Sequence, residues 1–375
     1  AGLAATAAWT TESNQVSASL GAVVACAGDV NGDGYSDVII GAASYEIGQT
    51  DEGWAFLYYG SATGLSFIAD WTAESNQAGA AYGWWVASAG DVNGDGYSDV
   101  IVGASDFDNG QTDEGRAFVY HGSALGLSAI ANWTAESDQV GAIFGFSVSS
   151  AGDVNGDGYS DVIVGAYKFD NGQTDEGRAF VYHGSALGLS AIANWTAESD
   201  QAGAIFGFSV SSAGDVNGDG YSDVIVGAES FDNGQTDEGR AFVYHGSADG
   251  LASAASWTAE SNQADAQLGW KVSSAGDVNG DGFSDVIIGA GGYDNGQFNE
   301  GRAYAYHGGT TGLPVAPNWV VESNLINDQF GYSLCGAGDV NGDGFADVLV
   351  AGSAAHAFHG SSGGLSTNPD WSIVG

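Results

Sequence analysis

One six-residue string, DVNGDG, recurs through the chain at a constant spacing. It starts at Asp29, Asp91, Asp153, Asp215, Asp277 and Asp339, so that each step is 62 residues. A fixed period of this length is typical of architectures in which each repeat is one structural unit that packs on its neighbours. The repeat therefore constrains the fold more strongly than any local preference does.

Each repeat contains four short segments with the composition of β-strands. In the third copy they are residues 146–151, 161–166, 178–183 and 192–198, which are rich in β-branched and aromatic residues and separated by Gly, Asn and Asp. No segment shows an apolar stripe at helical spacing. The sequence predicts an all-β, six-bladed β-propeller with four-stranded antiparallel blades, forming a single domain over residues 1–375. A linear solenoid is the alternative.

The charge of the chain limits its partners. Asp and Glu number 47 and Lys and Arg only 6, which gives a formal net charge of −41. Nucleic acids and anionic membranes are bound through clusters of basic residues, so both are excluded as partners. No apolar run reaches the ~20 residues of a membrane-spanning helix. With aromatics at 12%, the chain is also unlike a disordered acidic tail. We expect a monomeric ring.

The repeated string begins a set of oxygen donors at positions one, three, five and nine of a loop, with a backbone carbonyl available at position seven. Glycines at positions four and six allow the loop to curl, so that alternate residues can converge on one ion. The candidate ligands are Asp29, Asn31, Asp33, Tyr35, Asp37; Asp91, Asn93, Asp95, Tyr97, Asp99; Asp153, Asn155, Asp157, Tyr159, Asp161; Asp215, Asn217, Asp219, Tyr221, Asp223; Asp277, Asn279, Asp281, Phe283, Asp285; and Asp339, Asn341, Asp343, Phe345, Asp347.

The donor set favours Ca²⁺, about six ions in all, one per blade. Calcium takes six to eight oxygen ligands in flexible geometry, whereas Mg²⁺ prefers a rigid octahedron and Zn²⁺ prefers Cys or His. Plain hairpin turns are the alternative, although a turn has no use for three carboxylates that repel one another. Because cytosolic calcium is too low to fill weak sites, we expect a secreted or cell-surface protein.

The chain ends bear on how the blades close. A tryptophan of the outer strand recurs seven times for six loops, and both Trp9 and Trp371 are candidates for the closing strand. Cys26 lies three residues before Asp29, and Cys335 lies four before Asp339. This offset turns them to opposite sides of the first and last blades, so we expect a Cys26–Cys335 disulfide across the seam. Two buried free thiols are the alternative.

Three features together resemble the FG-GAP repeat, over nearly the whole chain. They are a Phe-Gly pair before the first strand, the D-x-N-x-D-G-x-x-D loop and a Gly-Ala pair after it. The pairs stand at Phe144-Gly145, Phe206-Gly207 and Phe330-Gly331, and at Gly165-Ala166 and Gly227-Ala228. That family builds the integrin α head propeller and many bacterial surface proteins, so the resemblance implies calcium in the loops.

This chain departs from the family pattern at several positions. Leu20, Tyr82 and Leu268 replace the phenylalanine, and the sixth unit has Ala351-Gly352 in place of Gly-Ala. Integrin heads and a similar mushroom lectin have seven blades, against six here. A ligand surface therefore does not carry over from the family.

Three classes of function are open. The first is a calcium-dependent adhesion or glycan-binding module with cell-surface proteins or glycans as partners. The second is a structural spacer that binds only metal. The third and weakest is a secreted enzyme domain. An enzyme needs a set of residues that breaks the repeat symmetry, and no non-repeated residues in this chain form a nucleophile–base pattern.

For the repeated side chains outside the loops, we expect structural roles. The hairpin of residues 108–116 carries Arg116, which we expect to pair with an acid such as Glu114. The alternative is that the hairpin binds a ligand, with the ring of Phe107 stacking on a sugar. His121 ends its strand in a His-Gly step that recurs in other units, which favours a structural hydrogen bond over catalysis.

Overall fold

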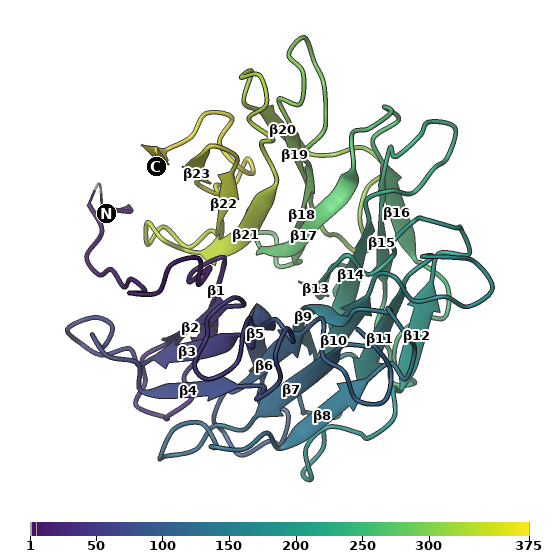
Figure 1. Cartoon of the computed structure of the whole chain (residues 1–375). Coiled ribbons are helices and arrows are strands. Elements are labelled where there is room, and N and C mark those ends of the chain that lie inside the picture. Colours follow the sequence, from purple (N-terminus) through teal and green to yellow (C-terminus); the bar gives the residue numbers. More distant parts are fainter. Residues whose placement is uncertain (1, 5, 375) are drawn as a thin grey trace. The chain divides into compact units, whose positions relative to one another are not determined.

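The computed structural model describes residues 2–4 and 6–374, and these form 24 β-strands and no helix. No helix in this part of the chain is therefore long and apolar enough to cross a membrane. The strands form six sheets of four antiparallel strands, each in sequence order (Figure 1). The predicted fold class, an all-β six-bladed propeller with a 62-residue repeat, is confirmed.

The chain divides into two compact units. Residues 7–153 and 157–198 form one unit, which carries the first three blades. Blade 1 contains β1 (Val23–Gly28), β2 (Asp37–Ala42), β3 (Trp54–Tyr58) and β4 (Trp71–Glu74). Blade 2 contains β5 (Tyr82–Gly90), β6 (Asp99–Ala104), β7 (Arg116–Tyr120) and β8 (Trp133–Glu136). Blade 3 contains β9 (Phe144–Gly152), β10 (Asp161–Ala166), β11 (Arg178–Tyr182) and β12 (Trp195–Glu198).

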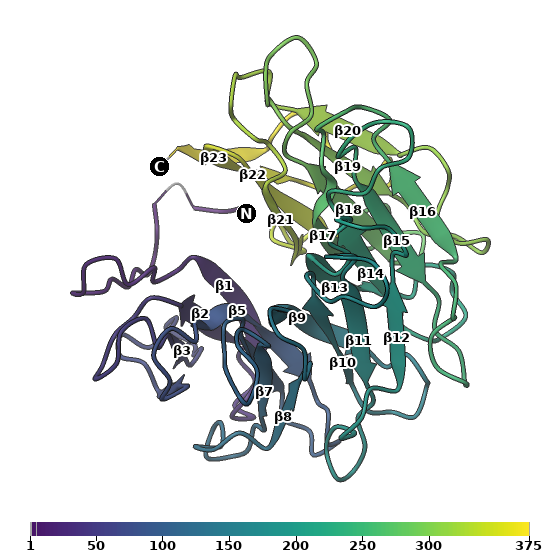
Figure 2. The ribbon, with the colours of Figure 1, turned by 45° about the vertical axis from the view of Figure 1, so that its right-hand side comes forward.

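The other unit, with the last three blades, contains the described residues among 1–6, 154–156 and 199–374. Blade 4 contains β13 (Ser209–Gly214), β14 (Asp223–Ala228), β15 (Arg240–Tyr244) and β16 (Trp257–Glu260). Blade 5 contains β17 (Leu268–Gly276), β18 (Asp285–Ala290), β19 (Arg302–Tyr306) and β20 (Trp319–Glu322). Blade 6 contains β21 (Ser333–Gly338), β22 (Asp347–Ala351), β23 (Ala354–Phe358) and β24 (Trp371–Val374). Figure 2 shows β13 to β16 side by side in one blade.

The core lies between consecutive blades. In the first unit, Val92, Ile101 and Val119 of blade 2 form one buried cluster with Val148 and Val162 of blade 3. Corresponding clusters join blades 1 and 2, 4 and 5, and 5 and 6. The second strand of blades 2 to 5 is buried on both faces, which explains its run of valine and isoleucine. Blade-to-blade packing therefore supplies the hydrophobic stabilisation.

The Phe-Gly and Gly-Ala pairs meet where two blades pack. Phe144 is fully buried, as are Tyr82 and Leu268, which replace phenylalanine in other blades. A Cβ atom added to Gly103 would lie 1.9 Å from the carbonyl oxygen of Gly145 in the next blade. Only glycine allows this approach of two backbones, and any apolar side chain of suitable size can fill the phenylalanine position.

The outer strand of each blade comes from its own repeat. β24 contains Trp371, whereas Trp9 lies outside any strand. Even so, the Trp9 indole donates a hydrogen bond to the carbonyl oxygen of Ser66 at 2.9 Å, just as Trp71 does to Ser128. Trp9 is therefore the surplus tryptophan, and it docks on blade 1 as an outer-strand tryptophan docks on the following blade.

The predicted disulfide is not formed in the structure. Cys26 and Cys335 are both free, and both are exposed. The buried free thiols of the alternative are also absent. The alternation along β1 explains the exposure of Cys26. Ala25 and Ala27 pack into the core shared with blade 2, so Val24 and Cys26 point to the opposite face. Val24 on that face is 56% exposed.

Candidate functional site

The six predicted metal loops connect the first and second strands of the six blades. The residue at position nine is the first residue of the second strand, at Asp37, Asp99, Asp161, Asp223, Asp285 and Asp347. The preceding ligand positions lie in the connecting loop and are partly or fully exposed, as in residues 91–97. The glycines at positions four and six have φ of 72° and 89° in the second loop, the left-handed conformation that lets the loop curl.

Backbone amides hold the side chains of each loop in place. In the second loop, the Asp91 carboxylate accepts the N–H groups of Gly94 at 2.7 Å and Gly96 at 2.8 Å. Asn93 Oδ1 accepts the N–H of Asp95 at 2.9 Å, and Asp95 Oδ1 accepts the N–H of Tyr97 at 3.1 Å. The loops of blades 1, 4, 5 and 6 repeat these contacts. The donor side chains are therefore organised by the loop itself.

The aspartate at position nine has a different environment. Asp99 is fully buried, and its two oxygens accept the N–H groups of Val92 and Gly122 at 2.9 and 2.8 Å. Burial raises the pKa of Asp99 to about 7, although these two backbone donors oppose the shift. Asp91 and Asp95 add to it by repulsion. A buried carboxylate beside two others is a group that a cation would stabilise.

The donor set fits a calcium ion. Every candidate ligand offers an oxygen, from its side chain or, at position seven, from its backbone carbonyl, and Ca²⁺ takes carboxylate, amide and backbone oxygens. Asp91, Asn93, Asp95, Asp99 and the Tyr97 carbonyl would hold the ion in blade 2. The three carboxylates of one loop do not all gather within 4.8 Å of one another, since the described acidic groups that do so lie elsewhere. Binding of an ion would therefore need the loop carboxylates to move closer together.

Neighbouring loops of one unit are in contact. The N–H of Ser98 in the second loop donates to the carbonyl oxygen of Asp29 in the first at 3.0 Å. A Cβ atom added to Gly32 would lie 2.5 Å from the ring of Tyr97. The aromatic residue at position seven thus covers the glycine at position four of the preceding loop. Its side chain is used for packing, which leaves only its carbonyl for a metal.

The histidine of the His-Gly step lies beside a loop. His121 Nδ1 is 3.2 Å from Asn93 Nδ2, the side chain of a candidate ligand. Burial lowers the pKa of His121, and Asp95 and Asp91 oppose the shift. The expected structural hydrogen bond is confirmed for this histidine, which orients Asn93.

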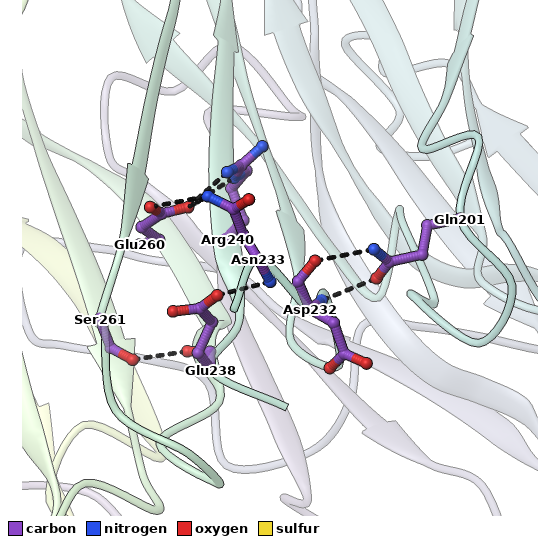
Figure 3. Close-up of polar contacts among 7 residues, drawn as sticks. All are labelled: Gln201, Asp232, Asn233, Glu238, Arg240, Glu260 and Ser261. Atoms are coloured by element: carbon purple, nitrogen blue, oxygen red, sulfur yellow. Dashed lines mark hydrogen bonds and ion pairs between the residues drawn. The ribbon is translucent and has the colours of Figure 1, made fainter. Parts of the chain in front are cut away.

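The hairpin arginines pair with a different acid from the expected one. Arg240 Nε donates to Glu260 Oε2 at 3.1 Å, and the two residues lie opposite each other on β15 and β16 (Figure 3). The expected pair with the hairpin glutamate, Glu114 in blade 2, is wrong, because Arg116 pairs with Glu136 at 2.7 Å.

The guanidinium groups also cover the candidate sugar platforms. Arg240 Cζ lies 4.2 Å from the centre of the Phe231 ring, and Arg116 Cζ lies 4.8 Å from that of Phe107. These rings are therefore occupied by a cation–π contact and are not free to stack on a sugar.

One pocket breaks the repeat symmetry. It lies between the hairpins of blades 4 and 5 and has a volume of about 290 Å³. Its lining residues are Asp237, Asp265, Gln267, Gly292, Asp294, Phe298 and Asn299. Phe298 is 60% exposed, whereas threonine stands at the equivalent position of blades 2 to 4. Asp265 and Gln267 likewise replace the glycine and isoleucine of blades 2 and 3.

The sequence reasoning missed this pocket. The three non-repeated residues are separated by up to 33 positions in the sequence, and only the packing of the blade 5 hairpin against the connection between β16 and β17 brings them together. The signal in the sequence is that Asp265, Gln267 and Phe298 differ from their equivalents in blades 2 and 3.

The family model described as "FG-GAP repeat" matches residues 22–53, 82–120, 144–182, 206–244, 268–306 and 330–365, which together are more than half of the chain. Integrin alpha-7 of Mus musculus is 35% identical over 39% of this chain and 12% of that protein. Integrin alpha-V of Gallus gallus is 32% identical over 55% of this chain and 20% of that protein. The chain thus spans less than a quarter of the length of these relatives.

A solved structure, that of Saccharomyces cerevisiae Sqt1, is similar over 90% of this chain and 71% of that one, with a TM-score of 0.51 and 11% identity. At this identity the likeness concerns the fold alone.

Proposed function

Because this chain belongs to the FG-GAP repeat family, we propose that it is a calcium-dependent adhesion-type module that acts outside the cell. The observation that carries the proposal is the repeated loop, in which backbone amides organise carboxylate and amide oxygens at positions one, three and five in each of blades 1, 2, 4, 5 and 6. One Ca²⁺ per loop, about six in all, would neutralise these acids. The ions would also tie together consecutive blades of one unit, because the loops of these blades contact each other.

The pocket beside Phe298 supports a glycan as the partner. An exposed aromatic ring can stack on the apolar face of a pyranose, and Asp265 and Gln267 offer hydrogen bonds to its hydroxyl groups. A pocket of about 290 Å³ has room for one sugar residue. With Asp237 and Asp294 also present, the pocket carries three carboxylates and would repel acidic sugars. The proposed ligand is a neutral sugar or an amino sugar.

The calcium part is tested by thermal unfolding of the purified chain in excess calcium and in excess chelator. Chelation should lower the melting temperature markedly, because an ion that binds only the folded state stabilises it by mass action. An equal melting temperature in the two buffers would refute a structural role for calcium.

The glycan part is tested on an array of neutral, amino and acidic sugars. Phe298→Thr is the matched variant, since it installs the residue that blades 2 to 4 carry at this position. Binding to neutral or amino sugars should fall at least tenfold in the variant, with the melting temperature unchanged. Silence of the wild-type chain on the array would favour the second candidate, a structural spacer that binds only metal.

A further inference from the structure

An acidic cluster at the outer edge of blade 2 is separate from the Asp-rich loops. We define the rim triad as Glu114, which ends the hairpin before β7, Glu136, the last residue of β8, and Asp138, two residues beyond it. One carboxylate oxygen of each residue lies within 4.8 Å of the other two. Oxygens that share a Ca²⁺ ion at about 2.4 Å lie at most about 4.8 Å apart, so the spacing suits a common ion.

The rim triad contains a buried carboxylate oxygen without a hydrogen-bond partner in the structure. Glu114 is fully buried, and its Oε1 accepts the N–H of Asn109 at 2.5 Å. Its Oε2 is also buried and has no hydrogen-bond partner. Leaving a charged oxygen in this state is costly. Glu238 of blade 4 has the same unpartnered oxygen. In blade 2 the carboxyl group also lies beside two further carboxylates, and this combination points to a ligand that the protein itself does not supply.

The charges of the cluster are only partly balanced. Arg116 is the basic partner, and it donates to Glu136 at 2.9 Å through Nε. Asn109 Nδ2 donates to the other oxygen of Glu136 at 2.7 Å. Three carboxylates and one guanidinium leave a formal charge of −2, which one divalent cation would neutralise.

We propose that the rim triad Glu114, Glu136 and Asp138 binds a divalent cation, with Ca²⁺ as the natural ion and water completing its coordination. The site is independent of the Asp-rich loops and of the proposed glycan pocket. With three protein ligands and an exposed Asp138, it should fill only at millimolar calcium, the range of extracellular modules.

Blade 4 offers a natural control. It has the same hydrogen bonds, with Asn233 and Arg240 on Glu260 and the Asn233 N–H on Glu238 (Figure 3). However, Asn262 stands where blade 2 has Asp138. The third carboxylate is thus missing there. Asn262 has a φ of 57° and Asp138 a φ of 55°, so asparagine suits this backbone conformation. Asp138→Asn should therefore fold normally.

The test uses crystals of the full chain soaked in Mn²⁺, which takes the same oxygen ligands and gives an anomalous signal. We expect an anomalous peak among the three carboxylates in the wild type, no peak there in Asp138→Asn, and none beside Asn262 in either protein. Calorimetric titration with Mn²⁺ should show one ion fewer per chain for Asp138→Asn. Absence of a peak at the rim triad of the wild type, or an equal peak in the variant, would overturn the proposal, whatever the loops bind.

Discussion

The ring of Tyr97 occupies the space that a side chain on Gly32 would need, with 2.5 Å between the added Cβ and the nearest ring atom. Gly32 also has a φ of 74°. Replacing it with alanine should therefore cost stability twice, through backbone strain of ~1–2 kcal/mol and through overpacking of ~1–3 kcal/mol. Denaturant unfolding of Gly32→Ala would measure the sum.

Gly34→Ala isolates the first of these two costs. Gly34 has a φ of 88°, and nothing lies within 4 Å of an added Cβ. Its unfolding free energy should fall by only the ~1–2 kcal/mol of backbone strain. Equal losses in Gly32→Ala and Gly34→Ala would contradict the proposed contact between loops.

A buried carboxyl group in blade 4 should make stability depend on pH. Glu229 is only 6% exposed, and its Oε2 has no partner. Burial, with a smaller contribution from Asp237, raises the pKa of Glu229 from its ordinary value of 4.5 to about 8. The folded state therefore holds this proton more tightly than the unfolded state. The stability that it contributes is complete below about pH 4.5 and is lost as the pH rises through about 8.

Glu229→Gln removes this titration. The variant should be more stable than the wild type at pH 8 by a few kcal/mol and should show no corresponding decline between pH 5 and 8. Urea unfolding at several pH values, with calcium held constant, makes the comparison. Parallel stability curves for the two proteins would show that Glu229 is ionised in the folded state.

The contacts of Arg240 at the blade edge depend on the planar shape of its guanidinium group. Arg240 stacks 4.2 Å from the Phe231 ring centre while its Nε donates to Glu260. Arg240→Lys keeps the charge but loses the fork and the stacking, so it should lower the unfolding free energy by about 1 kcal/mol. Glu260→Gln in the lysine background should then have a smaller effect than in the wild type. Independent effects of the two substitutions would contradict the pairing.

The hydrogen bond of Trp9 can be tested without removing its ring. Trp9 donates to the Ser66 carbonyl at 2.9 Å and packs edge-on against Tyr58, with 4.9 Å between ring centres. Trp9→Phe keeps an aromatic ring but leaves the acceptor unpaired, which should cost ~1 kcal/mol. Trp9→Ala should cost more, as the melting temperature would show. If all three proteins melted together, residue 9 would not dock on blade 1.

Much of the fold could be predicted from the sequence because each repeat is short and its strands are bounded by turn residues. The second strand of the third repeat, Asp161–Ala166, has the predicted bounds. The fourth begins at Trp195 and not at residue 192, since Ile192 is 80% exposed and belongs to the turn before the strand. Isoleucine is a residue type that favours strands even when it stands in a turn, so the sequence did not reveal where this strand begins.

The candidate site was predictable where it is local and not where it depends on contacts between segments that are distant in the sequence. The loop ligands lie within nine residues of one another, so spacing alone indicated them. The rim triad joins Glu114 to residues more than 20 positions away, and the pocket joins Phe298 to another blade's Asp237. The disulfide joins residues of the two compact units and stays a prediction, since both thiols are free in the structure and β1 turns Cys26 away from the face that packs on blade 2.

The cover that Tyr97 provides for Gly32, and the hydrogen bond from Ser98 to Asp29, bring residues of one repeat onto the loop of the repeat before it. During translation, the first loop therefore emerges from the ribosome before the residues that complete it have been made. Its final conformation is reached only after about one more repeat has been synthesised. Assembly of this unit should accordingly follow the order of synthesis, with each new blade finishing the loop of the previous one.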